Sequence, residues 1–162
     1  MWMMQFFGHS DGGSIALIFA AEYPETVRGI ITEAAHVFVE EITLQGIREA
    51  VDIYKNTHLK KKLAGYHGDN TEKIFRAWYE TWLQPEFKSW DIQDCLPKIK
   101  CPVPVIQGED DQYGTAAQVE AISKQVTGQS KPLLIPNCAH TPHKEARDRV
   151  TQEMTEFISG LL

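Results

Sequence analysis

The chain has 162 residues, of which 43% are hydrophobic and 23% charged, the composition of an ordinary globular domain that can bury a sizeable core. Its formal net charge of −6 argues against a general nucleic-acid binder, because such a protein carries a basic face. No apolar run approaches the roughly 20 residues of a membrane span, and Met1 to Phe7 has neither the basic leader nor the cleavage site of a signal peptide.

The first part of the chain predicts a strand, a helix and a second strand. Trp2 to Phe7 is apolar and favours a strand, whereas Gly12 to Tyr23 favours a helix that ends at Pro24. The packing face of this helix consists of small and apolar residues: Ala16, Leu17, Ala20 and Ala21. Val27 to Thr32 is a β-branched run without polar alternation, which predicts a parallel strand that is buried on both faces.

Residues 37–96 differ in character, because charged residues are mixed with aromatic ones at helical spacing. The spacing predicts helices over Thr43 to Asn56, Leu59 to Tyr66 and Thr71 to Leu83. Their apolar faces are Leu44, Ile47, Val51 and Tyr54 in the first helix, and Ile74, Phe75, Trp78 and Trp82 in the third. We interpret this block as a helical lid inserted between two strands. The alternative is a set of helices that simply pack on the sheet.

The last part of the chain returns to alternating strands and helices. Strands are expected at Val103 to Gln107 and Pro132 to Ile135, and helices at Ala116 to Val126 and Lys144 to Leu161. The final helix is expected to bury Val150, Met154, Phe157 and Ile158. The order strand, helix, strand, insertion, strand, helix, strand, helix predicts an α/β fold with about four parallel strands flanked by helices.

A serine lies between the first strand and the first helix, in the segment Gly8-His9-Ser10-Asp11-Gly12-Gly13. A G-x-S-x-G segment in this position is typical of a nucleophile elbow, a sharp turn that strains the serine backbone. The glycines allow neighbouring elements to approach, since a Cβ would clash there. The turn holds the serine Oγ clear of the sheet and near the positive end of a helix.

Three segments together resemble the C-terminal part of an α/β-hydrolase: the elbow, Gly108-Glu109-Asp110-Asp111, and Asn137-Cys138-Ala139-His140-Thr141-Pro142-His143. The catalytic triad of that family runs serine, acid, histidine along the chain, and this chain has the same order. The resemblance spans nearly all of the sequence. It implies a truncated α/β-hydrolase fold with a core at 1–36 and 97–162 and a lid at 37–96. The strands that a complete member places before the elbow are absent from the sequence.

The resemblance implies that Ser10 is the nucleophile, His140 the base and Asp111 the residue that orients the base. Each follows a predicted strand, at the end of a parallel sheet where ligands bind. Asp110 competes with Asp111, and His143 competes with His140, although we expect His143 to cap the last helix or face solvent. The bland alternative is that all of them are ordinary turn residues.

Other chemistry is less well supported by the sequence. Cys138, His140 and His143 have poor spacing for zinc, and nothing marks Cys138 as an activated nucleophile. The sequence also lacks G-x-G-x-x-G and P-loop motifs, so we expect neither a cofactor nor a metal. His36, Trp78 and Trp82 are candidate pocket residues, for which packing roles are the alternative, and His9 is interpreted as a packing residue.

Acyl transfer also needs donors for the oxyanion, and the backbone N–H of Asp11 is expected to be one of them. In the family, the second donor comes from a loop after an earlier strand, which lies outside this sequence. We therefore expect a serine hydrolase that acts on an ester, thioester or activated amide through an acyl-enzyme. The alternatives are a weak or silent relative that serves as a binding or assembly module, and a fragment with its partner sequence encoded upstream.

Two further expectations concern the setting of the protein. Without preceding strands, Met1 to Phe7 is an unpaired apolar strand edge, which predicts a homodimer formed through that edge. No nucleic-acid or membrane partner is expected. The three cysteines, Cys95, Cys101 and Cys138, are odd in number and irregularly spaced, which favours reduced thiols and a cytoplasmic location.

Overall fold

The computed structural model describes residues 4–161, so the first three residues of the expected Met1 to Phe7 edge lie outside the described residues. The chain forms two compact units. One combines the residues up to Phe38 with those from Asp91 onward, and the other is Val39–Trp90. These boundaries differ by two to six residues from those expected at 36/37 and 96/97.

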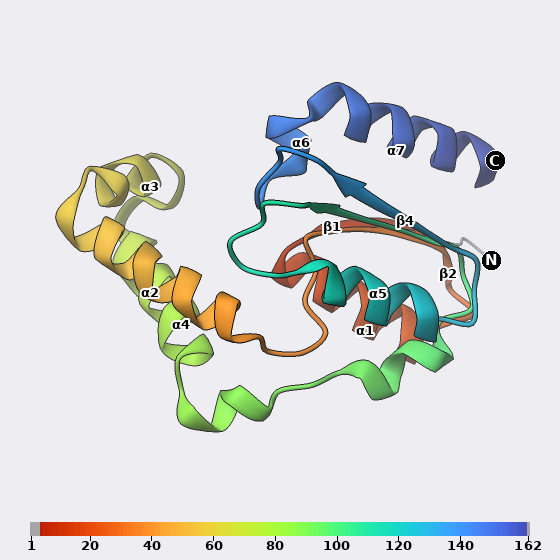
Figure 1. The fold of residues 1–162 in the computed structure, drawn as a ribbon, viewed down its shortest axis with the longest axis horizontal. Helices are drawn as coiled ribbons and strands as arrows, with labels where there is room; N and C mark the ends of the chain where they lie inside the picture. The colour runs from red at the N-terminus through yellow and green to blue at the C-terminus, as the bar shows by residue number, and fades with distance from the viewer. Residues whose placement is uncertain (1–3, 162) are drawn as a thin grey trace. The chain divides into compact units, whose positions relative to one another are not determined.

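The first unit contains a four-stranded parallel sheet (Figure 1). Its strands are β1 (Met4–His9), β2 (Val27–Glu33), β3 (Val103–Gly108) and β4 (Ser130–Ile135), in spatial order β1-β2-β3-β4. All three neighbouring pairs are parallel, as the alternation of elements predicts.

Helices cover both faces of this sheet (Figure 1). The helices α1 (Asp11–Glu22) and α5 (Ala116–Gln125) pack on one face together with the 3₁₀ helix η3 (Gln93–Lys98), and α7 (Arg147–Leu161) packs on the other. The predicted packing face of α1 is confirmed, since Ala16, Leu17, Ala20 and Ala21 are all buried.

The two faces of β2 lie in different hydrophobic cores. Ile30 packs with Leu17 of α1, whereas Ile31 packs with Val150 of α7. Ile30 and Ile31 are 0% and 2% exposed, so the prediction of a strand buried on both faces is confirmed. Burial of each side chain is worth about 1.5–3 kcal/mol relative to exposure. These contacts fix β2, the strand beside the elbow strand β1.

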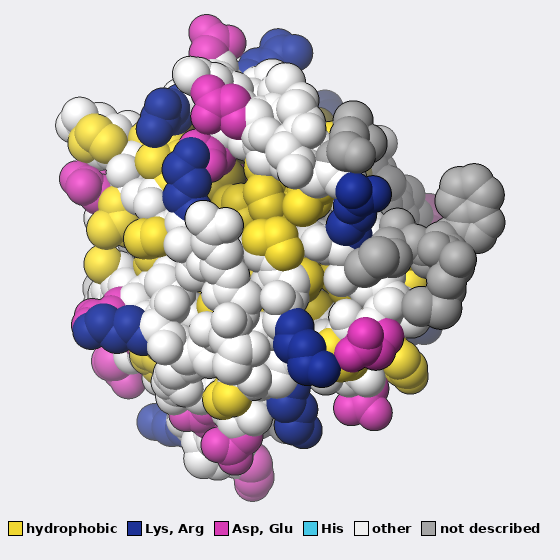
Figure 2. Space-filling view, turned by 90° about the vertical axis from the view of Figure 1, so that its right-hand side faces the viewer, with side chains coloured by type: hydrophobic (Ala, Val, Ile, Leu, Met, Phe, Trp, Pro, Cys, Tyr) yellow, Lys and Arg dark blue, Asp and Glu magenta, His cyan; other side chains and the backbone are white. Residues whose placement is uncertain are grey.

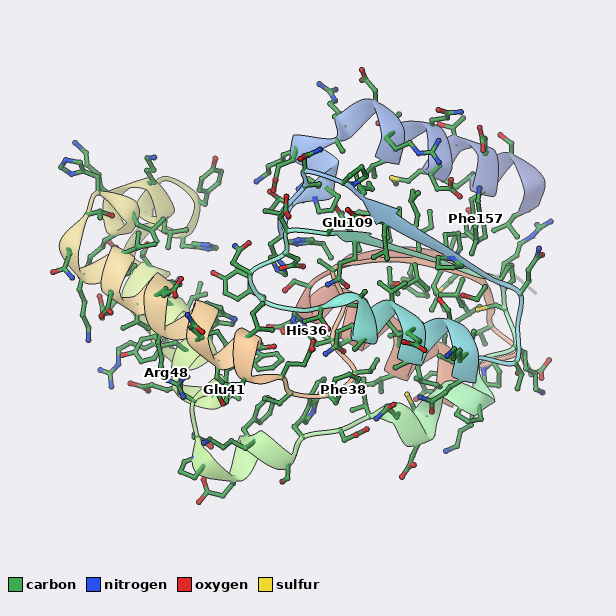
Figure 3. All side chains as sticks on the ribbon, viewed as in Figure 1. His36, Phe38, Glu41, Arg48, Glu109 and Phe157 are labelled. Atoms are coloured by element: carbon green, nitrogen blue, oxygen red, sulfur yellow. The ribbon has the colours of Figure 1, made fainter. Side chains whose placement is uncertain are left out.

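The second unit consists of α2 (Glu41–Asn56), α3 (Leu59–His67), α4 (Thr71–Trp82) and the 3₁₀ helices η1 (Gly68–Asn70) and η2 (Pro85–Ser89). Its core includes Val51, Tyr54 and Phe75, and the Tyr54 and Phe75 rings stack with centroids 3.9 Å apart. The predicted buried residues of α2 are confirmed. Ile74 of α4 was expected on the apolar face but is 45% exposed. An exposed ion pair joins Glu41 and Arg48 (Figure 3).

The prediction of one C-terminal helix over Lys144 to Leu161 is wrong. A short helix α6 (Pro142–Glu145) precedes α7, and Ala146 between them departs from helical geometry at φ −128° and ψ 43°. Ala146 packs against the core of Ile31 and Val150, which redirects the chain. Ile158, expected to be buried, is 38% exposed. No helix described between residues 4 and 161 has the length and apolar character to cross a bilayer.

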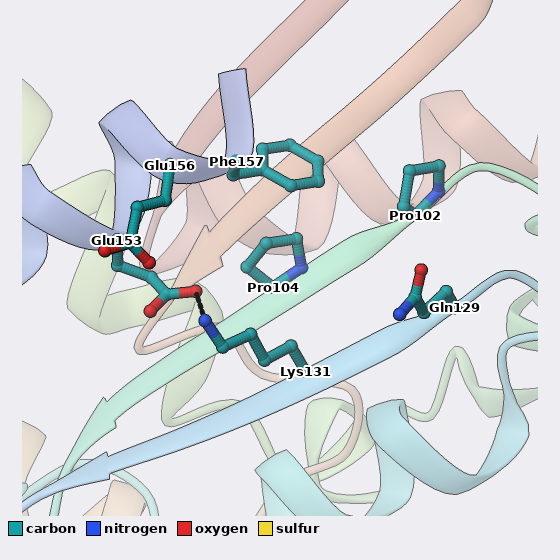
Figure 4. Close-up of a pocket in the computed structure, with 7 residues that line it drawn as sticks. All are labelled: Pro102, Pro104, Gln129, Lys131, Glu153, Glu156 and Phe157. Carbon is teal, nitrogen blue, oxygen red and sulfur yellow. Dashed lines mark ion pairs between the residues drawn. The ribbon is translucent and has the colours of Figure 1, made fainter. Parts of the chain in front are cut away.

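A pocket lies between α7 and the first residues of β3 and β4 (Figure 4). Hydrophobic side chains also gather between charged ones on the face that Figure 2 shows. In the pocket, Lys131 Nζ lies 2.6 Å from an oxygen of Glu153, whose side chain is only 3% exposed. Because β3 and β4 begin beside this pocket, it lies at the amino end of the sheet. It is therefore separate from the site at the carboxyl end.

We predict that Lys131→Met lowers the free energy of unfolding by about 1–2 kcal/mol, because it leaves the buried Glu153 carboxylate unpaired. Urea unfolding measures this change. The matched control is Lys124→Met, which removes the exposed pair with Glu120 and costs at most about 0.5 kcal/mol. Equal losses in the two variants would contradict the prediction, as would a failure of Lys131→Met combined with Glu153→Met to regain stability.

Candidate active site

Three predicted side chains meet at the carboxyl end of the sheet. Ser10 follows β1, Asp111 follows β3 and His140 follows β4. His140 Nε2 lies 3.0 Å from Ser10 Oγ, and His140 Nδ1 lies 2.9 and 3.0 Å from the two carboxylate oxygens of Asp111. The Asp111 side chain is fully buried and that of His140 is 12% exposed. The three groups thus form one continuous hydrogen-bonded line.

Ser10 has the strained backbone expected of the elbow, with φ 54° and ψ −126°. Its N–H donates to the Glu33 carbonyl over 2.8 Å, and its own carbonyl accepts from Gly13 N–H. A Cβ on Gly8 would overlap the Gly12 carbonyl, and one on Gly13 would lie 2.6 Å from Ala35 Cβ. The turn therefore requires glycine at positions 8 and 13, on the two sides of the serine.

The structure distinguishes Asp111 from Asp110. Asp111 Oδ1 accepts from Tyr113 N–H at 2.8 Å as well as facing His140, so its carboxylate is fixed in place. Asp110 is exposed, and its backbone N–H donates to the Cys138 carbonyl. Asp111 is therefore the carboxylate that lies against the imidazole. Because a carboxylate only accepts, His140 Nδ1 carries the proton and Nε2 is free to accept one from Ser10.

The loop that carries His140 is held by the carboxylate of Glu145 and by the imidazole of His9. Glu145 accepts from the backbone N–H groups of Ala139 and Thr141, at 2.7 and 3.0 Å. It also accepts from the Thr141 hydroxyl, and these bonds lower the pKa of Glu145. His9 Nε2 donates to the His140 carbonyl over 2.7 Å. The loop conformation is thus set by bonds to groups on both sides of it.

Comparison with known proteins identifies the fold. No family model matches the chain. Serine hydrolase BPHL of Homo sapiens is 29% identical over 160 residues, which cover 93% of this chain and 53% of that protein. A serine hydrolase involved in carbazole degradation, the CarC enzyme, superposes with a TM-score of 0.73 at 19% identity, over 98% of this chain and 64% of that one.

The name of a third similar protein states its fold. MGS-M2, an α/β-hydrolase enzyme from a Medee basin deep-sea metagenome library, has a TM-score of 0.68 at 22% identity, over 97% of this chain and 65% of its own. This chain has the α/β-hydrolase fold. It is truncated relative to these structures and spans about half the length of the curated relative it matches.

His143 has a different environment from the one expected. Its side chain stays 33% exposed, but its Nδ1 lies 3.0 Å from Glu33 Oε2, and its backbone N–H donates to Glu33 Oε1. The Glu33 side chain is fully buried. Glu33 was not identified from the sequence. The signal was available, because an acidic residue directly follows a strand predicted to be buried on both faces.

Two further histidines surround the line of catalytic candidates. The His9 ring lies 4.9 Å from the His140 ring and 5.1 Å from the His143 ring. His36 Nε2 lies 3.0 Å from the Tyr113 carbonyl, and its ring is 6.1 Å from that of His140; Figure 3 labels His36 at this end of the sheet. Burial lowers the pKa of both His9 and His36, so both are neutral at pH 7.

The remaining candidates lie as follows. Asp11 begins α1, where backbone N–H groups lack partners within the helix, so its N–H is suited to an oxyanion. Trp78 contacts Phe75, and Trp82 contacts Phe87 and Trp90, all in the helical unit. A pocket role for these tryptophans stays a prediction. Cys138 is buried, which raises its thiol pKa to about 11 and keeps it protonated at neutral pH.

We predict that Gly8→Ala lowers the free energy of unfolding by about 2–3 kcal/mol, because the new Cβ overlaps the Gly12 carbonyl. Gly12→Ala is the matched control within the same motif. It meets no atom within 4 Å and stabilises α1 by up to about 1 kcal/mol. Denaturant unfolding of the two variants measures both effects, and equal losses would contradict the structural account of the turn.

The burial of His36 predicts a pH dependence of stability. Its pKa is lower in the folded state than the ordinary value of 6.5, so the unfolded chain binds a proton more readily. The part of the folding stability that depends on a neutral, buried His36 is fully present above pH 6.5. It is lost as the pH falls from that value toward the lower pKa of His36 in the folded state. We expect His36→Gln to flatten the decline in stability between pH 8 and pH 5, as measured by urea unfolding. An unchanged slope would contradict this.

Proposed function

We propose that this chain is a serine hydrolase that cleaves a carboxylic ester, thioester or activated amide through an acyl-enzyme. The unbroken line from Asp111 through His140 to Ser10 carries the proposal. The human and carbazole-degradation relatives named above are serine hydrolases, which supports the same type of reaction. The chain covers only 53% and 64% of them, so its own activity is part of the proposal.

The geometry supports the following sequence of steps. Ser10 Oγ attacks the substrate carbonyl while His140 Nε2 takes its proton, and Asp111 stabilises the imidazolium that results. His140 then returns the proton to the leaving group, which leaves an acyl-Ser10. Water, activated by His140, hydrolyses the acyl group. The N–H of Asp11 is the proposed donor to the oxyanion, and one such donor is worth about 10²–10³ in rate.

Three further assignments belong to this proposal. The helical unit Val39–Trp90 is inserted between β2 and β3, which supports its assignment as a lid, and Trp78 and Trp82 are proposed as its pocket residues. His36 is proposed as a pocket residue, since its ring lies 6.1 Å from His140. All three cysteines are free, which supports a reducing, cytoplasmic setting.

A second candidate function is that of a binding or assembly module. In that case the chain would be a catalytically weak or silent relative of the hydrolases. The chain matches 53% of its curated relative, so the activity of that protein does not decide between the two functions. The two functions differ in one measurable property, the reactivity of the Ser10 hydroxyl.

We predict that a fluorophosphonate probe labels the wild-type chain and that Ser10→Ala abolishes both labelling and nitrophenyl-ester turnover. Asp111→Asn lowers kcat by about 10⁴-fold, because His140 loses its orienting carboxylate. Asp110→Asn is the matched control and leaves both rates unchanged, since its side chain is exposed. Turnover that persists in Ser10→Ala would exclude the hydrolase proposal, and an unlabelled wild type would favour the binding module.

The partner that we propose is a second copy of the chain. Within residues 4–161, β1 pairs only with β2, and Met4 and Phe7 are 41% and 42% exposed. An apolar strand with one unpaired edge is a template for another strand. Two β1 edges related by a two-fold axis would pair with each other.

We predict a dimer in sedimentation at micromolar concentration, and a shift to monomer in Phe7→Lys, because a charge on an edge strand opposes pairing. Lys at the exposed position Ile15 of α1, Ile15→Lys, is the control for added charge and leaves the dimer intact. A folded wild-type monomer at that concentration would exclude the dimer.

A further inference from the structure

Glu33, the last residue of β2, contacts both halves of the proposed active site. Its backbone carbonyl accepts from the N–H of Ser10 at 2.8 Å. Its carboxylate accepts from the backbone N–H of His143 at 2.5 Å and lies 3.0 Å from His143 Nδ1. One residue therefore joins the turn that carries the nucleophile to the loop and short helix that follow the base.

Burial of the Glu33 carboxylate in this position costs folding free energy. Its side chain is fully buried at the end of a strand whose apolar residues Val27, Ile30 and Ile31 pack in two hydrophobic cores. A buried ion loses its hydration, and a well-packed apolar residue of similar volume is often equally or more stable. The two donors of His143 satisfy the carboxylate, so the pair is tolerated. Stability alone is a weak reason for a glutamate here.

The bonds to the His140 loop fall into two groups. Those from Glu145 are local, since they join residues 139, 141 and 145, and they set the shape of the loop. Those from Glu33 and His9 come from β1 and β2, where His9 and Glu33 are paired in register. This second group joins the loop directly to the strand that precedes Ser10 and to its neighbour, since Ser10 follows His9 in the chain.

We propose that Glu33 is a positioning residue for the hydrolysis proposed above: through His143 it holds the His140 loop so that His140 Nε2 stays within reach of Ser10 Oγ. This inference rests on the proposed function for its catalytic consequence, whereas the link itself is structural. The distance between the two reacting atoms is 3.0 Å. A displacement of about 1 Å would break the contact and cost about 10²-fold in rate.

Two substitutions of Glu33 separate the link from general stability. Glu33→Leu places an apolar side chain of similar size in the buried position and removes both acceptors. Glu33→Gln keeps an acceptor for His143 N–H and loses the charge. Glu109→Gln is the control, because it removes an exposed carboxylate at the same end of the sheet (Figure 3). His143→Phe weakens the link from the partly exposed partner and serves if Glu33→Leu does not fold.

Two measurements are made on each folded variant. Hydrogen exchange, followed by mass spectrometry, compares the amides of residues 137–146 with those of β3 and needs no activity. The second-order rate of fluorophosphonate labelling at Ser10, with kcat and KM for a nitrophenyl ester, reports the reaction. Labelling amplitude gives the fraction of correctly folded sites, so a loss of folded protein is distinguished from a loss of rate.

We expect Glu33→Leu to exchange about tenfold faster in residues 137–146 with β3 unchanged. Its labelling rate and kcat fall by about 10²-fold at full amplitude, while KM changes little. Glu33→Gln falls between Glu33→Leu and wild type, and Glu109→Gln matches wild type. His143→Phe changes in the same direction as Glu33→Leu.

Wild-type exchange in residues 137–146 of Glu33→Leu, or of His143→Phe where that variant replaces it, would overturn the proposal. So would an unchanged labelling rate, or a loss of amplitude without a loss of rate. A wild-type chain that the probe does not label would refute the proposed function, and the positioning role would fail with it. Faster exchange in that case would identify Glu33 as a purely structural link, so the two failures are distinguishable.

Discussion

The backbone of Ser10 is the constraint on which the site depends. A non-glycine residue at φ 54° costs of the order of 1–3 kcal/mol, and it persists only where surrounding contacts hold it. Here the Glu33 carbonyl accepts from Ser10 N–H, and the first turn of α1 closes on the Ser10 carbonyl. Gly8 and Gly13 leave no Cβ at the two closest approaches. The strain places Oγ at the carboxyl end of the sheet, where the other two groups converge.

Parallel pairing explains why groups so distant in sequence converge. The strands β1, β2, β3 and β4 run in the same direction, so the residues after them emerge at one end. Backbone bonds then join the loops to each other: Asp110 N–H donates to the Cys138 carbonyl, and Glu109 N–H to the Ile135 carbonyl. The distances from His140 to Ser10 and Asp111 are therefore consequences of strand register and of these loop contacts.

The sequence was sufficient for features that depend on local pattern. The elbow motif, the parallel sheet and the buried face of α2 each follow from residues close together in the chain. It was insufficient where a residue's role depends on a distant partner. The pairing of His143 with Glu33 spans 110 residues, and the break at Ala146 reflects packing against β2 and α7. Helical periodicity in the sequence does not predict either contact, because both involve residues that are far apart in the chain.

The charges around His140 follow from the same burial. Two buried carboxylates each face one imidazole, Asp111 with His140 and Glu33 with His143. His9 and His36 lie beside His140, and burial lowers the pKa of both, so neither adds a positive charge next to it at neutral pH. A proton on His140 Nε2 then has the Asp111 carboxylate opposite its Nδ1 and uncharged rings beside it. Desolvation therefore keeps like charges away from the ring that exchanges a proton with Ser10 in the proposed mechanism.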